Sequence, residues 1–239
     1  PAHGSPNARP FPQFVPPPGV GNGRKLVTAA VSPDGTRAAG AEEGVVRLWE
    51  VTTGKELGAW PVEIACDDLP VGRLLAFSPD STRLAAASRD GKIRIWDTAT
   101  ARELHRLAAG GVVHGLAILP DGASLVAAAG EGPAAEAGRE NGTVRLIDLK
   151  SGKRVRRFGS YSLKAASLAV SPDGRMLATT GDSPAVRLWD VANAKEITAF
   201  EGHGAAPTAM AFTPDGTRLV TAGPDSTGLV WQIPGRPPR

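Results

Sequence analysis

An all-β repeat protein is predicted by three recurring features of this 239-residue sequence. The first is a short apolar run, usually containing arginine and ending in tryptophan, at residues 46–49, 93–96, 144–147, 186–189 and 229–231. The second is a Pro-Asp turn, which lies 16 or 17 residues before the end of the run in four copies. The third is a pair of short turns that flank the run. Because the turn prolines are 41 to 52 residues apart, the features define a repeat architecture of five copies.

Turn chemistry divides each repeat into short antiparallel strands. In the Ser-Pro-Asp-Gly turn at 32–35, proline presets φ, aspartate can bond to nearby backbone and glycine suits the exit from the turn. Asp90 with Gly91, and Asn141 with Gly142, are dipeptides typical of β-hairpins. The first repeat is therefore expected to hold strands near 26–31, 37–41, 45–49 and 56–60. The fifth repeat is expected to hold three.

The first strand of each repeat reads mainly as a large residue, alanine and another large residue. The copies are residues 29–31, 75–77, 116–118, 168–170 and 210–212. An antiparallel sheet with one wet face would alternate apolar with polar residues, whereas a sheet enclosed between neighbours stays apolar on both sides. We therefore expect both faces of these strands to be buried.

The remaining segments set the domain organisation. Residues 1–24 contain seven of the 21 prolines and are expected to form a mostly disordered linker, and 234–239 a tail. The repeats are assigned to 25–60, 71–107, 111–158, 162–200 and 203–233. Repeat three carries a Gly- and Ala-rich insertion at 130–140, which is expected to project as a flexible loop.

Composition excludes several function classes. The formal charge is +3, with lysines and arginines spread through the repeats, so no nucleic-acid partner is expected. Cys66 is the only cysteine, which rules out an intrachain disulfide and fits a reducing compartment. No apolar stretch approaches the length needed to cross a bilayer. We therefore expect a cytoplasmic protein without a membrane partner.

These repeats resemble those of the WD-repeat β-propeller family. The resemblance is carried by the Pro-Asp turns, by Trp96 with Asp97 and Trp189 with Asp190, and by a period near that family's 40 to 45 residues. It covers residues 25–233 and implies an all-β propeller built from four-stranded antiparallel blades, with five repeats visible.

The family also has a hydrogen-bonded network made by a Gly-His pair, a Ser or Thr on strand two, an Asp before strand three, and the Trp. The resemblance assigns this network in repeat five to His203, Thr221, Asp225 and Trp231. Its implied role is structural, locking the geometry of the blade, and not that of a catalytic dyad.

The other repeats depart from this pattern. Glu43 and Asn141 occupy the Asp position, Ile147 replaces Trp, and Asp182 is one position out of register. Asp90, with Trp96, keeps half of the network in repeat two. The first four blades should therefore be held less tightly.

No pattern in the sequence predicts catalysis. Gly-Lys pairs lack the following Ser or Thr of a phosphate-binding loop, and the four histidines, with one cysteine, show no zinc spacing. No catalytic, cofactor-binding or metal-binding residue is therefore predicted, and no cofactor.

The resemblance favours a non-catalytic scaffold, not an enzyme, that binds protein or peptide partners through propeller loops and faces. Two alternatives stay open: an enzyme that uses a propeller face or channel, and a module that self-associates. The count of five repeats has two explanations. Either this is the C-terminal part of a larger, bacterial-type protein with an upstream signalling or regulatory domain, or five blades close through a strand at residues 11–15.

Overall fold

The computed structural model describes residues 26–42, 44–62, 64, 74–130, 142–161, 167–181 and 183–235. Regular secondary structure in these residues consists of strands in five antiparallel sheets. Blades 1 and 2 comprise β1 (Leu26–Val31), β2 (Arg37–Glu42), β3 (Val45–Glu50), β4 (Glu56–Pro61), β5 (Leu75–Phe77), β6 (Arg83–Ala87), β7 (Lys92–Asp97) and β8 (Glu103–Ala108).

Blades 3 to 5 follow the same plan, and within every blade the strands lie side by side in sequence order. They comprise β9 (Val113–Ile118), β10 (Ser124–Gly130), β11 (Gly142–Asp148), β12 (Arg154–Tyr161), β13 (Ser167–Val170), β14 (Met176–Thr180), β15 (Val186–Asp190), β16 (Glu196–Phe200), β17 (Ala209–Phe212), β18 (Arg218–Ala222) and β19 (Gly228–Gln232). Blade 5 has three strands. The predicted all-β architecture of propeller blades is confirmed.

The turn between strands one and two is stabilised by its own side chains. In blade 1, Ser32 Oγ donates to Asp34 Oδ1 at 2.6 Å and accepts from the Arg37 N–H at 2.9 Å. Gly35 adopts a left-handed φ of 70° and its N–H donates to the Ser32 carbonyl. The hydrogen bond from the Ser32 hydroxyl is the main reason that the pKa of Asp34 falls to about 2. The Ser-Pro-Asp-Gly signature therefore encodes the first bend of the blade.

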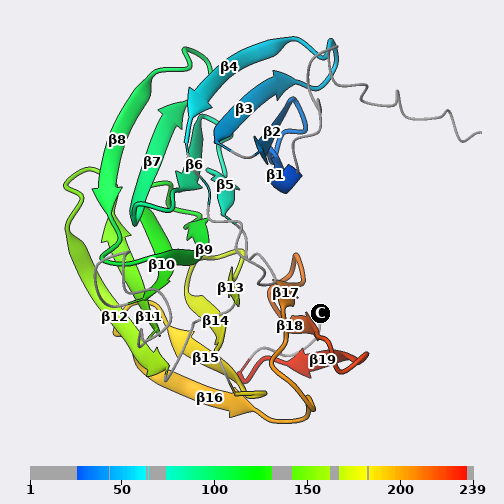
Figure 1. The fold of residues 1–239 in the computed structure, drawn as a ribbon. Coiled ribbons are helices and arrows are strands. Elements are labelled where there is room, and N and C mark those ends of the chain that lie inside the picture. The colour runs from blue at the N-terminus through cyan, green and yellow to red at the C-terminus, as the bar shows by residue number, and fades with distance from the viewer. Residues whose placement is uncertain are drawn as a thin grey trace, which may run out of the picture.

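The blades follow one another around an arc that is open between blade 1 and blade 5 (Figure 1). The first strands, β1, β5, β9, β13 and β17, lie toward the centre and pack in series, and the fourth strands lie on the rim. Residues 11–15, which one explanation of the repeat count assigned to closure, lie outside the described part of the chain.

Burial follows this arrangement. The second strands of blades 2 and 4 are almost entirely buried, because each has a blade on both sides. In blade 5 every second residue of β18 is exposed, and Val230 on β19 is 61% exposed. Val31 at the end of β1 is 64% exposed. The expectation that every first strand is buried on both faces is therefore wrong for β1 and β17, whose exposed residues include Val31 and Ala211, which face the cavity at the centre of the arc.

Aromatic contacts join one blade to the next. Trp60 on β4 stacks on Trp96 of blade 2 at 4.6 Å between ring centroids. Phe158 on β12 meets Trp189 of blade 4 edge-on at 6.4 Å. Leu107 and Ile147 take these positions between blades 2 and 3, and Phe200 stacks on Trp231 between blades 4 and 5. The fourth strand in each of blades 1 to 4 thus covers the aromatic or aliphatic side chain at the equivalent third-strand position of the next blade.

Removing one of these contacts should destabilise the chain. We expect Phe158→Ala to lower the free energy of unfolding by about 3–5 kcal/mol, because the ring is fully buried and its loss leaves a cavity between blades. Val155→Ala, on the same strand at a half-exposed position, should cost less than about 1 kcal/mol. Urea unfolding followed by circular dichroism measures both. Equal losses would contradict the role given to Phe158.

Candidate functional site

The structure brings together the four residues assigned to a network in repeat five. His203 lies between β16 and β17, Thr221 on β18, Asp225 in the turn before β19, and Trp231 on β19. His203 Nδ1 lies 2.8 Å from Asp225 Oδ2, and His203 Nε2 lies 2.7 Å from Thr221 Oγ1. The Trp231 indole N–H donates to Thr221 Oγ1 at 2.8 Å. The network therefore ties the loop that enters blade 5 to the second and third strands.

The donor and acceptor capacities of the four side chains decide which group donates in each hydrogen bond of the network. Since the Trp231 indole can only donate, Thr221 Oγ1 accepts from it and donates its own proton to His203 Nε2. His203 then donates from Nδ1 to the carboxylate of Asp225. A neutral imidazole with its proton on Nδ1 satisfies every member.

The carboxylate of Asp225 is held ionised by its donors. Burial raises the pKa of Asp225, but the hydrogen bond from His203 and those from the backbone N–H groups of Thr227 and Gly204 outweigh this effect. The pKa therefore lies well below its ordinary value of 3.8. Because the side chain of His203 is fully buried, no substrate can reach the imidazole. We propose that the network has a structural role and locks blade 5.

Blade 4 holds a shorter version of this network that sequence reasoning missed. The Trp189 indole N–H donates to Thr179 Oγ1 at 2.7 Å, and both side chains are buried. Thr179 lies two residues after Leu177, the strand partner of Trp189, just as Thr221 lies two residues after Leu219. This equivalent spacing was the available signal.

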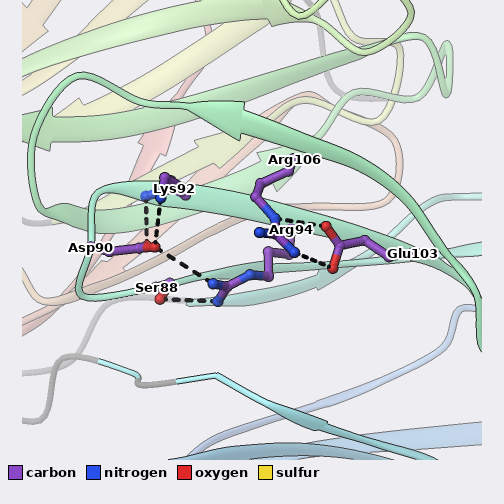
Figure 2. Close-up of polar contacts among 6 residues, drawn as sticks. All are labelled: Ser88, Asp90, Lys92, Arg94, Glu103 and Arg106. Atoms are coloured by element: carbon purple, nitrogen blue, oxygen red, sulfur yellow. Dashed lines mark hydrogen bonds and ion pairs between the residues drawn. The ribbon is translucent and has the colours of Figure 1, made fainter.

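In blade 2 the expected half-network does not form. The buried Trp96 indole nitrogen has no hydrogen-bond partner among the described residues, because Ala86 stands where blades 4 and 5 have threonine. Asp90 instead accepts from the Lys92 backbone N–H and pairs with the Lys92 and Arg94 side chains at 3.3 and 3.5 Å (Figure 2). Glu43, Asn141 and Asp182 lie outside the described residues.

A cavity of about 540 Å³ lies where the first strands of all five blades converge. The side chains that line it are apolar apart from that of Ser171, whose hydroxyl donates to Asp173 and accepts from the Met176 N–H, and backbone atoms supply the polar part of the lining. The other lining residues come mostly from the large-Ala-large strands and the turn prolines. The cavity lining supplies no titratable side chain, so it fits apolar groups and offers no acid or base.

A second hollow, of about 310 Å³, lies on the rim of blade 3 and is lined by Arg145, Arg154, Val155, Arg156 and Arg157. Sequence reasoning treated the arginines as scattered and missed it. The available signal was residue 154, because repeat three has arginine where repeats one, two and four have glutamate.

The described residues show neither a metal-binding cluster nor a membrane-spanning helix. They contain no group of three His, Cys, Asp or Glu side chains placed to hold a metal ion. None of their segments forms a helix long and apolar enough to cross a bilayer. Cys66 and residues 131–140 of the insertion lie outside the described part of the chain, and Gly130 is the last residue of β10.

Sheets of this topology define the class as β-propeller blades, and comparison with known proteins shows a likeness to WD repeats. The family model for the WD domain, G-beta repeat, matches residues 73–97, 152–190 and 194–232. The WD repeat-containing protein SL1-17 of Schistosoma mansoni is 28% identical over 160 residues, covering 66% of this chain and 48% of that protein. These matches and the antiparallel sheets fit a WD-repeat β-propeller, which the sequence resembles.

A solved structure supports the fold independently. Hydrazine synthase from Kuenenia stuttgartiensis matches with a TM-score of 0.68 at 20% sequence identity, over 82% of this chain and 55% of that one. At this identity the likeness shows the fold alone. The chain spans about half the length of both proteins.

Two threonine substitutions should separate the full network from its shorter version. Thr179→Val leaves one buried indole N–H unpaired, at a cost of about 1–3 kcal/mol in unfolding free energy. Thr221→Val leaves both the Trp231 indole and His203 Nε2 without Thr221 Oγ1, so it should cost more. Thermal and urea unfolding of the two variants measure the difference. A smaller loss for Thr221→Val would contradict the coupling described for blade 5.

Proposed function

We propose that this chain is a non-catalytic interaction module that binds protein or peptide partners and receives an apolar segment of the partner at the central cavity. The observation that carries the proposal is the apolar lining contributed by all five blades. Binding cavities of several hundred Å³ are typically lined by apolar side chains with few polar groups, and this one has that character.

The chemistry of the cavity favours binding over catalysis. Acid-base and nucleophilic catalysis need titratable or activated groups within reach of a substrate. The one hydroxyl in the lining, that of Ser171, is fully buried and already bonded to Asp173 and Met176. WD repeats generally mediate interactions between proteins, which supports the same assignment. The single cysteine supports a reducing, cytoplasmic location.

A displayed library of random peptides, selected against the purified chain, tests this function. We expect the selected peptides to be rich in apolar residues. Val31→Glu and Ala211→Glu place a carboxylate at exposed positions of the cavity lining, so each should weaken binding of a selected peptide at least about tenfold. Fluorescence anisotropy with the labelled peptide measures the dissociation constants.

Leu104→Glu provides the matched control, because Leu104 is an exposed apolar residue on β8, on the rim. This variant should bind the peptide as the unmodified chain does. Selection of no peptide, or equal binding by all three variants, would overturn the assignment to the central cavity.

A further inference from the structure

We propose that the outer strand of blade 3 carries a second binding site, which takes a phosphorylated side chain of a protein partner. The site is the arginine groove, defined as the hollow lined by Arg145, Arg154, Val155, Arg156 and Arg157. It is separate from the central cavity, and the inference does not depend on the function proposed for that cavity.

The first argument is the charge pattern of the other blades. In blade 1, Arg47 on the third strand pairs with Glu56, the first residue of the fourth strand, at 2.7 Å. In blade 4, Arg187 and Glu196 make the same pair at 2.8 Å. In blades 1 and 4 the first residue of the fourth strand is therefore an acid that pairs with an arginine of the third strand.

In blade 2 the carboxylates pair with a different set of cations. Glu103, also the first residue of its fourth strand, accepts two hydrogen bonds from Arg106 at 2.8 and 3.0 Å. Arg94 pairs with Asp90 and donates to Ser88 (Figure 2). Arg94 and Arg106 thus each pair with a carboxylate, and Asp90 also pairs with Lys92.

Blade 3 reverses the charge at that position. Arg154 is the first residue of β12 and lies opposite Ile147, as Glu56 lies opposite Trp49. Arg157 lies directly opposite Arg145, as Arg106 lies opposite Arg94 in blade 2, whereas blades 1 and 4 have alanine there. The position that supplies an acid in three blades supplies a cation here.

Two guanidinium groups converge on one point of the neighbouring loop. A Cβ at Gly110 would lie 2.5 Å from Arg154 Nη2 and 3.0 Å from Arg145 Nη1, so both guanidinium groups lie against this glycine. Arg145 is 6% exposed and donates to the Ala109 and Gly130 carbonyls, which fixes its direction. Arg154 and Arg156 are exposed and form no ion pair with any described residue.

This chemistry fits a compact dianion better than the alternatives. The planar fork of arginine matches the oxygens of a phosphate, and a phosphorylated side chain brings close to two negative charges and three acceptors to one point. A nucleic acid would need a positive track across several blades, but the neighbouring arginines of blades 2 and 4 are neutralised. Half-exposed Val155 beside the arginines offers an apolar contact to a peptide.

An array of degenerate peptides with a fixed central phosphoserine tests the inference. The strongest binder is then synthesised with phosphoserine, serine or glutamate at that position, and its affinity for the chain is measured by fluorescence anisotropy. We expect the phosphoserine form to bind at least about tenfold more tightly than the other two.

Arg154→Glu gives this blade the acid that the other three carry, so the variant should fold and keep its thermal midpoint. It should weaken the phosphopeptide at least about tenfold. Arg102→Glu makes the same change in net charge at an exposed position of blade 2 and should leave the affinity unchanged.

Three results would overturn the proposal. They are the absence of any phosphoserine-dependent binder, equal weakening by Arg154→Glu and Arg102→Glu, and binding of a single-stranded RNA with the same dependence on Arg154. The last result would assign the groove to nucleic acid. None of them bears on the central cavity, because Arg154 lies on the rim strand of blade 3.

Discussion

The packing of each blade's outer strand against the third strand of the next blade is the interaction on which the rest of this structure depends. A single four-stranded antiparallel sheet of small residues has two apolar faces, and only a neighbour on each side can remove both from water. The stacked Trp60 and Trp96 rings, and the edge-on Phe158 and Trp189 rings, make these joints specific. Each blade is therefore stabilised by contacts with its neighbours, as in other repeat proteins.

The buried hydrogen-bond network is more complete in blade 5, which has less apolar packing, than in blade 2, which has more. Blade 5 has three strands and an exposed outer face, yet it contains the full His203, Thr221, Asp225 and Trp231 network. Within the described residues, blade 2 has neighbours on both sides and tolerates a buried Trp96 indole nitrogen without a partner. A satisfied buried network rigidifies what surrounds it, so the end blade obtains from hydrogen bonds some of the order that inner blades obtain from packing.

The sequence predicted the fold well because turn chemistry and apolar patterning are local. Pro-Asp turns, hairpin glycines and the recurring tryptophans were enough to place four strands in each of blades 1 to 4 and three in blade 5. What depends on distant neighbours was not predicted. Val31 is exposed because it lines the central cavity, and the Trp96 indole is left without a threonine partner because Ala86 stands at the equivalent position. The arginine groove was missed because Arg154 stands out only when it is compared with the glutamates at the equivalent positions of blades 1, 2 and 4.

The claim that contacts between neighbouring blades stabilise each blade is tested most directly by amide hydrogen exchange of the second strands, followed by mass spectrometry. Strands β2, β6, β10, β14 and β18 are each paired on both sides within their blades, so differences among them report the contacts between blades. The account predicts the slowest exchange in β10, in the middle of the arc, and faster exchange in β2 and β18 at its ends. Equal protection in all five strands would contradict it, because the end blades would then be as well enclosed as the central one.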